Sequence, residues 1–283
     1  MRILITGGKG MLGKDLEMVM KSESKNEMIV TDREELDITN IDETMKFVRE
    51  VRPEVIINCA AYTNVDGCES DYDGAYKLNV TGAGNLAIAA NEVNAAIMQI
   101  STDYVFDGNK GKSYLEHDKT NPLSVYGETK LAGEELVKNF CNKHYIVRTQ
   151  WLFGKNGNNF VKTMQRLSNE KDCLMVVNDQ FGSPTYTVDL CKAISELVTT
   201  PQYGTYHITN SEVVSWHEFT VEIMKQSGRS GISVEPCDTS QFPRPAARPA
   251  YSPLENYLWK SSGRKALRSF REALSDYLED LRS

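Results

Sequence analysis

The sequence predicts an α/β fold, with a doubly wound parallel sheet followed by a smaller C-terminal region. Over the first 150 residues, short apolar runs alternate with helical patterns. A glycine-rich turn directly follows the first apolar run. After residue 150 the chain becomes rich in loops, and six of its nine prolines lie between 201 and 255. These three observations together indicate two unequal domains.

Short apolar runs predict the strands of the sheet, at 2–6, 27–31, 54–60, 96–101 and 145–149. Helical patterns lie between them, at about 11–20, 41–51 and 72–92 and in the stretch that contains Lys130. Thr39 and Asn40 are good caps for the second helix, and Pro53 breaks the chain before the third strand. Because neighbouring parallel strands need a crossover, this alternation predicts right-handed βαβ units.

The second half of the chain is assigned mainly to a separate domain, with residues 1–150 in the first domain and 151–283 in the second. The boundary is soft, because the segment of about 187–210 has a helix and a strand that could return to the first sheet. Further predicted elements are a helix at 159–169, a strand at 173–177 and a last, basic amphipathic helix at 265–281. The basic residues of this last helix are expected on a solvated face.

The composition narrows the classes of function and location. A net charge of −7 argues against a general nucleic-acid or anionic-membrane binder. No window approaches the roughly 20 apolar residues of a membrane span, and the opening "MRILITGG" fits a buried strand rather than a signal peptide. Six cysteines without a CxxC pair and four histidines without ligand spacing predict reduced thiols, no metal site and a cytoplasmic location.

The glycines after the first strand have the spacing of a phosphate-binding turn. Gly7, Gly10 and Gly13 follow the pattern G-x-x-G-x-x-G, and Met11 and Leu12 begin the helix. Glycine permits a positive φ and a close approach of the backbone to a pyrophosphate, while the helix N-terminus offers free N–H groups. The order of strand, loop and helix predicts a Rossmann-type NAD(P)-binding domain in residues 1–150.

The residues after the second and third strands are expected to contact the rest of the cofactor. Asp32 suits the ribose hydroxyls, which favours NADH, whereas Arg33 suits a 2′-phosphate, which favours NADPH. The sequence leaves the choice between NADH and NADPH open. The other candidates are Asp37 and Ile38 beside the adenine, and Ala60, Ala61 and Tyr62 after the third strand.

Three side chains are candidates for acid–base chemistry at a carbonyl. Thr102 follows the fourth predicted strand, and ligands of open α/β sheets bind at the carboxyl ends of strands. Tyr126 and Lys130 stand one helical turn apart, so their side chains share a face. A lysine ammonium would make Tyr126 a better acid and bind the nicotinamide ribose, while Thr102 aligns the carbonyl oxygen. Each residue alone is more simply a cap or an exposed turn, but together behind a glycine-rich loop they predict catalysis.

These residues also carry a resemblance to a known family. Gly7–Gly13, Thr102, Tyr126 and Lys130 resemble the extended short-chain dehydrogenase/reductase superfamily. Over nearly the whole chain the sequence is similar to the dTDP-4-dehydrorhamnose reductase family, in the segments AAYTNVDGCE, STDYVFDG, YGETKLAGE, VRTQWLFG, NFVKTM, DQFGSPT and RPAYSPLEN. The resemblance implies NAD(P)H-dependent reduction of the 4-keto group of dTDP-4-dehydro-L-rhamnose to dTDP-L-rhamnose, a step of cell-surface polysaccharide biosynthesis. It also implies that Tyr126 is the proton donor.

The same resemblance implies a nucleotide-sugar site formed by the strand ends and by residues 151–283. Its candidate residues are Val65, Thr102, Asp103, Tyr126, Trp151, Gln180 and Arg248. Trp151 offers a flat apolar face to a pyrimidine or a sugar, and the guanidinium of Arg248 matches the oxygens of a diphosphate.

The residues after Thr102 separate related chemistries. Sugar-nucleotide dehydratases of the superfamily have Asp-Glu after the threonine, whereas this chain has Asp103 and Tyr104. Plain ketone reduction is therefore favoured over elimination of water. Two alternatives stay open: another sugar-nucleotide reductase or epimerase, and a non-catalytic NADP-binding regulatory subunit resembling the methionine adenosyltransferase β subunit. A homodimer is compatible with the sequence, and nothing in the sequence indicates Mg²⁺.

Overall fold

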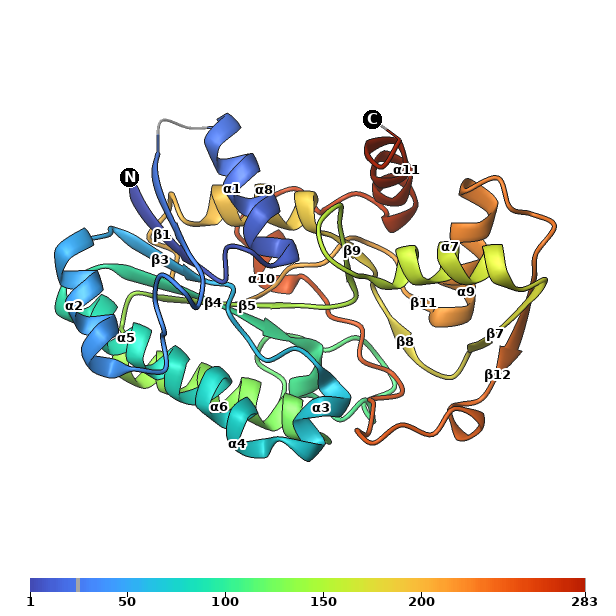
Figure 1. Cartoon of the computed structure of the whole chain (residues 1–283), viewed down its shortest axis with the longest axis horizontal. Helices are drawn as coiled ribbons and strands as arrows, with labels where there is room; N and C mark the ends of the chain where they lie inside the picture. Colours follow the sequence, from blue (N-terminus) through green and yellow to red (C-terminus); the bar gives the residue numbers. More distant parts are fainter. Residues whose placement is uncertain (24–25, 283) are drawn as a thin grey trace.

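The structure is a computed structural model that describes residues 1–23 and 26–282. In this part of the chain, six strands form one parallel sheet in the order β10-β5-β4-β3-β1-β2 (Figure 1). Their bounds are β1 Arg2–Thr6, β2 Glu27–Thr31, β3 Val55–Asn58, β4 Ala96–Thr102, β5 His144–Thr149 and β10 Gly204–His207. The chain winds outward from β1 in both directions, which confirms the predicted doubly wound α/β fold.

Helices cover both faces of this sheet (Figure 1). One face carries α1 and α8, and the other carries α2, α5 and α6. Leu16 and Ile194 belong to the apolar cluster on the first face, and Val48, Leu86 and Val137 to the cluster on the second. The strands are thus buried on both sides, as their near-continuous apolar runs require. The bounds of the helices are α1 Met11–Glu23, α2 Ile41–Val51, α5 Ala83–Glu92, α6 Val125–Phe140 and α8 Thr187–Leu197.

The single helix expected over 72–92 is interrupted in the structure. It consists of α4 Tyr72–Tyr76, a π-helical turn Lys77–Gly82 and then α5. A π turn inserts one extra residue per turn and is often found at functional sites. Asn79 lies in this turn and is buried, and its Oδ1 accepts the backbone N–H of Tyr62 at 2.8 Å. The turn therefore helps to fix the segment that follows β3.

Most residues after 150 build a smaller region, at the right of Figure 1. Its strands pair as short ladders, β6 with β9, β8 with β11 and β7 with β12. Phe153, Phe219 and Tyr277 are buried at the centre of its separate apolar core. The bounds of its elements are β6 Leu152–Phe153, α7 Phe160–Glu170, β7 Cys173–Val177, β8 Phe181–Gly182, β9 Thr185–Tyr186, β11 Val214–Ser215, α9 Trp216–Gln226, β12 Ser233–Cys237 and α11 Phe270–Asp280.

Part of the second half of the chain returns to the main sheet. Helix α8 packs against α1, and β10 pairs with β5 in parallel register, with Gly204 opposite Tyr145. The main sheet therefore contains strands from both halves of the sequence. Short helical segments complete the chain: α3 Val65–Ser70, a 3₁₀ turn Asp103–Val105, a 3₁₀ turn Thr239–Gln241 and α10 Tyr257–Ser261.

Two helices differ from the prediction. Helix α9 lies in the stretch 201–255, which was expected to be dense with loops, yet Ser215 begins it with a capping box that is legible in the sequence. The last helix begins at Phe270 rather than near 265, because Ser269 caps it in the same way. The preceding arginines are paired rather than solvated, as Arg268 shows by its ion pair with Asp189.

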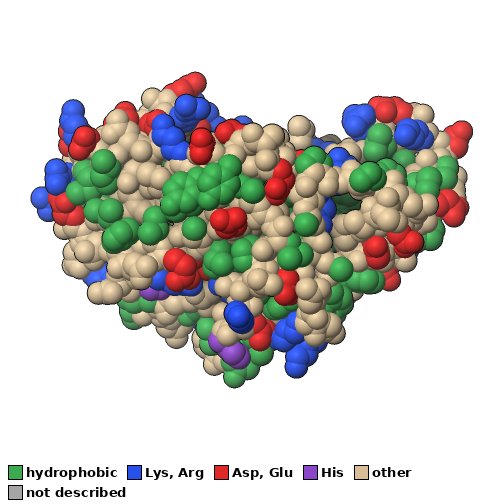
Figure 2. Space-filling view, turned by 90° about the horizontal axis from the view of Figure 1, so that it is seen from below, with side chains coloured by type: hydrophobic (Ala, Val, Ile, Leu, Met, Phe, Trp, Pro, Cys, Tyr) green, Lys and Arg blue, Asp and Glu red, His purple; other side chains and the backbone are tan. Residues whose placement is uncertain are grey.

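The surface carries hydrophobic side chains over α4, α5 and α6. Seen from below the view of Figure 1, they gather along this side of the molecule (Figure 2). The exposed large hydrophobic residues of these helices include Tyr72, Tyr76, Ile88 and Phe140. Apolar surface of this kind is a common feature of protein–protein contacts.

Three features are absent from the described residues. No helix among residues 1–23 and 26–282 is long and apolar enough to cross a bilayer. Within the same ranges, no three His, Cys, Asp or Glu side chains are grouped as ligands for a metal ion. None of the cysteines in the described chain forms a disulfide.

Candidate active site

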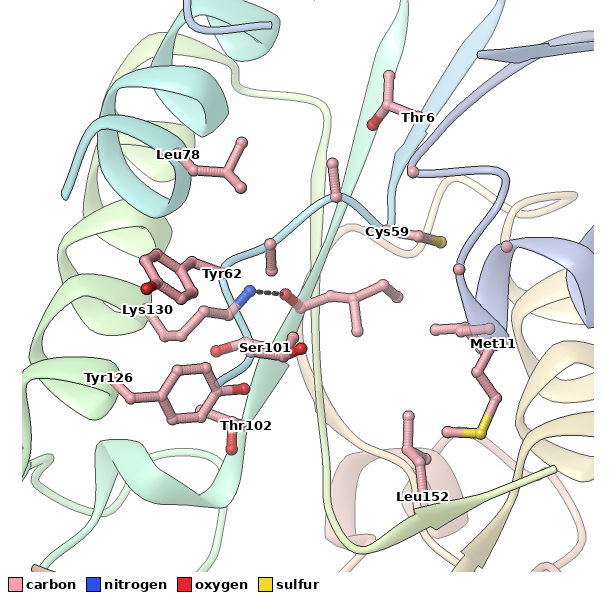
Figure 3. Close-up of a pocket in the computed structure, with 18 of the residues that line it drawn as sticks. Thr6, Met11, Cys59, Tyr62, Leu78, Ser101, Thr102, Tyr126, Lys130 and Leu152 are labelled. Carbon is pink, nitrogen blue, oxygen red and sulfur yellow. Dashed lines mark hydrogen bonds between the residues drawn. The ribbon is translucent and has the colours of Figure 1, made fainter. Parts of the chain in front are cut away.

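A large cavity, of about 1060 Å³, lies at the carboxyl ends of the parallel strands. Thr6 and Thr102 line it from the last residues of β1 and β4, and Cys59 lines it from the residue after β3 (Figure 3). Thr149, the last residue of β5, lines it as well. The cavity spans the place where the strand order reverses, which is where open α/β sheets bind their ligands. Its position indicates a ligand-binding site.

The predicted glycine-rich turn forms one wall of this cavity. Gly7 has a φ of +70°, and a Cβ there would lie 2.6 Å from the backbone nitrogen of Ala60. A Cβ on Gly13 would collide with the carbonyl oxygen of Gly7 and lie 2.8 Å from the Cα of Gly8. Helix α1 begins at Met11, so its first residues, whose N–H groups have no partner within the helix, line the cavity. The backbone thus forms a close cradle that has no room for side chains.

The residues after β2 line the cavity as well. The carboxylate of Asp32 accepts the backbone N–H of Lys9 at 2.9 Å and that of Arg33 at 2.8 Å. Arg33 is exposed at the cavity edge. Asp37 and the buried Ile38 also line the cavity, and a hydrogen bond from Thr39 holds the pKa of Asp37 below its ordinary value.

The segment Ala60–Tyr62 forms the floor between the cradle and α6. Ala60 donates its N–H to Asn58 at 3.1 Å, and Asn58 is itself bound by Thr6 and Gln99. Tyr62 is held by Asn79 of the π turn. Ala60, Ala61 and Tyr62 all line the cavity, so the structure brings together the predicted cofactor-contacting residues of three strand ends.

Thr102, Tyr126 and Lys130 lie side by side at the cavity (Figure 3). Thr102 is the last residue of β4 and accepts the N–H of Tyr104 at 3.2 Å. Ser124 caps α6 by accepting the N–H of Gly127, so the helix begins just before Tyr126. Lys130 is buried and donates from Nζ to the backbone oxygen of Ile100, at 2.6 Å (Figure 3). The three candidate catalytic residues therefore meet from two neighbouring elements.

Burial governs the protonation of these side chains. It raises the pKa of Tyr126, and the hydrogen bond with Thr102 acts in the opposite direction. It lowers the pKa of Lys130 to about 8, while the carboxylate of Glu134 acts to raise it. The raised pKa of Tyr126 is opposite to the expectation that Lys130 makes it more acidic, because burial outweighs the other influences on the phenol. The ammonium of Lys130 binds a backbone carbonyl instead.

Asp103 is a buried carboxyl directly after Thr102. It accepts hydrogen bonds from the hydroxyl of Thr102 at 3.1 Å and from that of Ser252 at 2.6 Å. Burial raises its pKa to about 6 despite these hydrogen bonds. Because Ser252 belongs to the C-terminal segment, Asp103 connects the end of β4 to the smaller region.

The Asp103 carboxyl is expected to make stability depend on pH. A folded pKa above the ordinary value of 3.8 means that its contribution is complete below about pH 4 and is lost as the pH rises through about 6. The loss is roughly 3 kcal/mol, at 1.36 kcal/mol per unit of pKa. Asp103→Asn should therefore lose less free energy of unfolding than the wild type between pH 4 and pH 8, as measured by urea denaturation. Equal losses in the two proteins would contradict this assignment.

The structure places some of the candidate substrate residues at the cavity and others away from its lining. Val65, Asp103 and Trp151 line the cavity. Trp151 has a φ of 49° and stacks on Trp216, with ring centroids 3.4 Å apart and planes at 10°. This stacking fixes the indole at the cavity edge. The two remaining candidates, Gln180 and Arg248, do not line the cavity.

Gln180 and Arg248 are engaged elsewhere. Gln180 donates from Nε2 to Thr239 at 3.0 Å. Arg248 makes two hydrogen bonds of 3.0 Å with the carboxylate of Asp66, which lies at the start of α3. A guanidinium binds two carboxylate oxygens as readily as two phosphate oxygens, so residue type alone did not predict this partner.

Several lining residues were not predicted from the sequence. Tyr104 lies against Tyr126, with ring centroids 5.4 Å apart in an edge-to-face arrangement. Thr149 and Gln150 line the cavity with buried polar atoms that have no hydrogen-bond partner in the described residues. Unpaired buried polar groups beside a cavity mark candidate ligand contacts. Tyr104 directly follows the candidate Asp103, Gln150 directly precedes the candidate Trp151, and Thr149 ends the strand predicted at 145–149, so their places in the sequence were the available signal.

Comparison with known proteins agrees with this geometry. The family model of the RmlD substrate binding domain matches residues 1–283. A dTDP-4-dehydrorhamnose reductase of Aggregatibacter actinomycetemcomitans is 42% identical over 90% of this chain and 90% of its own length. The crystal structure of a dTDP-4-dehydrorhamnose reductase from Clostridium acetobutylicum is 48% identical, covers 100% of both chains and has a TM-score of 0.97. That of the enzyme from Bacillus anthracis, in complex with NADP, is 43% identical, covers 99% of both chains and has a TM-score of 0.94. This chain belongs to the RmlD substrate binding domain family.

Proposed function

We propose that this chain is an NAD(P)H-dependent reductase that converts the 4-keto group of dTDP-4-dehydro-L-rhamnose into the hydroxyl of dTDP-L-rhamnose. The observation that carries the proposal is the meeting of Thr102, Tyr126 and Lys130 in one cavity with a glycine-rich cradle. The cavity volume lies just above the range of about 300–1,000 Å³ that is usual for one small ligand, as a dinucleotide and a nucleotide sugar together require. Relatives that are named for this substrate and match along the chain support the choice of sugar.

The cradle fits a dinucleotide. Gly7 and Gly13 leave no room for a Cβ, so the backbone N–H groups at the start of α1 would hold the pyrophosphate. Lys130 would hold the nicotinamide ribose. Because the carboxylate of Asp32 is bound by backbone N–H groups while Arg33 is exposed, NADPH should be preferred over NADH. The cofactor, when bound, supplies the hydride that reduces the carbonyl carbon.

Tyr126 donates the proton that the carbonyl oxygen needs as hydride adds to the carbon. The C=O double bond is thereby converted into a C–H and an O–H bond. Burial raises the pKa of Tyr126, so the phenol is protonated at neutral pH and ready to donate. Thr102 orients the carbonyl oxygen, and the ammonium of Lys130 stabilises the phenolate that remains until it recovers a proton from solvent.

The nucleotide sugar is proposed to lie between α3 and the start of β6. Val65 and Trp151 would contact it from these two sides, and Trp151 is held ready by its stacking on Trp216. Asp103 would hold the hydroxyl of Thr102 in place by accepting its hydrogen bond. Arg248 would reach the diphosphate by exchanging the carboxylate of Asp66 for phosphate oxygens. Gln180 would contact the nucleotide sugar by exchanging its hydrogen bond to Thr239 for one to the substrate.

The proposed function is tested by incubating the purified protein with dTDP-4-dehydro-L-rhamnose and NADPH, and following the absorbance of the reduced nicotinamide. Turnover to a product that co-elutes with dTDP-L-rhamnose is expected, with a lower KM for NADPH than for NADH. Turnover of only a different sugar nucleotide would identify a sister reductase. Binding of NADPH without turnover of any sugar nucleotide would identify a regulatory subunit.

We further propose that two copies of the chain form a homodimer through the surface of α4, α5 and α6. The exposed hydrophobic side chains on this surface, such as Tyr76, Ile88 and Phe140, support this arrangement. Light scattering coupled to size-exclusion chromatography should then give a mass near twice the 31.8 kDa of one chain. A mass of a single chain at micromolar concentration would refute the proposal.

A cytoplasmic location is part of the same proposal. Cysteines without disulfides suit a reducing compartment. Cys68 and Cys141 are buried in the core, where a reduced thiol packs as a small hydrophobic side chain.

A further inference from the structure

A buried ion pair lies directly behind the candidate catalytic residues. Glu134, on α6, is fully buried, and Arg148, on β5, is nearly so. Arg148 donates from Nε and Nη2 to the two carboxylate oxygens of Glu134, at 2.9 and 2.7 Å. Ser101, on β4, donates its hydroxyl to the same carboxylate at 2.5 Å. Removing two charges from water is costly, so a buried pair is better explained by what it positions than by added stability.

The pair belongs to a series of contacts that joins α6 to β4. Tyr126, Lys130 and Glu134 are spaced by one helical turn each and therefore share one face of α6. That face meets the last three residues of β4: Lys130 binds the backbone oxygen of Ile100, Glu134 binds Ser101, and Tyr126 lies at Thr102. Three successive turns of the helix thus contact the last three residues of the strand, although not in the same order.

We propose that Glu134 is a positioning residue for the reduction, whose carboxylate, held by Arg148 and Ser101, fixes α6 on β4 so that Tyr126 and Lys130 meet Thr102. The inference rests on the proposed function. Ser101, Glu134 and Arg148 are together called the clamp. The clamp joins α6, β4 and β5, so it sets the separation of the proton donor from the strand that carries Thr102.

The clamp also places a negative charge near Lys130. Burial acts to raise the pKa of Glu134, but the charge and hydrogen bonds of Arg148 hold it below its ordinary value, so the carboxylate is ionised. Lys138 also approaches this carboxylate, at 3.5 Å. Glu134 in turn acts to keep Lys130 charged, against the burial that lowers the pKa of Lys130 to about 8.

The other titratable groups around Lys130 come from three elements. Tyr126 shares its helix, Cys59 and Tyr62 follow β3, and Asp103, which lines the same cavity, follows β4 (Figure 3). The effect of the thiol of Cys59 on the pKa of Lys130 ranks below that of Glu134. Burial raises the pKa of this thiol to about 12, so the thiol is neutral over the pH range in which Lys130 titrates. Glu134 is therefore the ionised group on which the charge of Lys130 chiefly depends.

Glu134→Gln tests the proposal, because it removes the charge and keeps the shape. Without the carboxylate, Lys130 should lose its proton at a lower pH. NADPH affinity, measured by fluorescence titration, should fall as the pH rises and Lys130 loses its proton. In the variant this fall, the alkaline limb of the pH profile, should occur about one pH unit lower than in the wild type. The kcat should fall about tenfold with a smaller change in the KM of the sugar, as expected for a misplaced proton donor. Glu135→Gln, on the neighbouring exposed residue, should leave both properties unchanged.

A second variant guards against loss of folding, since Glu134→Gln leaves the charge of Arg148 buried and unpaired. The double variant Glu134→Met with Arg148→Met replaces the pair by apolar side chains of similar length, a change that proteins commonly tolerate. It should fold, show the lowered kcat, and show the alkaline limb displaced in the same direction but by less, because loss of the guanidinium partly offsets loss of the carboxylate. A folded double variant with the pH profile, NADPH affinity and kcat of the wild type would overturn the proposal. If the wild type does not reduce the sugar, the proposed function fails, but the pH dependence of NADPH affinity still decides the role of the clamp.

Discussion

Replacing Tyr126 with phenylalanine is expected to lower kcat for the reduction by about 10²–10⁴-fold, the usual contribution of a positioned general acid. The substitution removes only the phenol oxygen that lies at Thr102. The ring keeps its edge contact with Tyr104, so the shape of the cavity should be retained. The cradle and Lys130 are unchanged, so the affinity for NADPH should change little. Steady-state rates and a fluorescence titration of NADPH measure the two effects separately.

A matched control is the same change at an exposed tyrosine. Tyr257 is 48% exposed, its ring contacts His117, and neither residue lines the cavity. Tyr257→Phe should therefore retain the wild-type kcat. A wild-type kcat in Tyr126→Phe would refute the assignment of the proton donor. A loss of NADPH affinity as large as the loss of kcat would show instead that the phenol holds the cofactor.

The sequence predicted those parts of the site that depend on neighbours in the chain. Strand β1, the glycines and α1 are consecutive, so their order could be read as an apolar run, a turn and a helical pattern. Tyr126 and Lys130 share one helix whose cap, Ser124, is two residues before the tyrosine. The capping box of α9, which begins at Ser215, was equally local and was overlooked.

The parts that the sequence did not predict depend on contacts between distant residues. Trp151 was expected to offer a free face, but its stacking on Trp216 decides which face is free. Arg248 was assigned to a diphosphate, and in the structure it binds the carboxylate of Asp66, 182 residues away. A residue type limits the chemistry of a contact, whereas the fold selects the partner.

The protonation of the site also depends on the fold. From the sequence, Lys130 was expected to lower the pKa of Tyr126, because opposite charges favour each other. The structure adds burial, which raises the pKa of Tyr126 and lowers that of Lys130. These two shifts favour a protonated phenol at neutral pH, which is the form that a proton donor requires. Turning the ammonium of Lys130 from Ile100 toward a bound ribose would then restore its effect on the phenolate.

Gly13→Ala is expected to weaken NADPH binding by about 10- to 100-fold, because overpacking a tight contact costs about 1–3 kcal/mol. The new Cβ would collide with the carbonyl oxygen of Gly7 and lie 2.8 Å from the Cα of Gly8. These neighbours are backbone atoms, so the turn itself must move to accommodate the methyl group. Movement of the turn displaces the N–H groups that would hold the pyrophosphate. The dissociation constant of NADPH, measured by fluorescence titration, reports this displacement directly.

Gly231→Ala provides the control, because in the described structure a Cβ at Gly231 meets no other atom within 4 Å. Its affinity for NADPH should equal that of the wild type. Circular dichroism of both variants separates a displaced turn from an unfolded chain. If folded Gly13→Ala bound NADPH as tightly as the wild type, the turn would not be the pyrophosphate site, since its close packing could change without consequence. A raised dissociation constant with retained helical signal would place the cofactor at the first turn of α1, where the strand order of the sheet reverses.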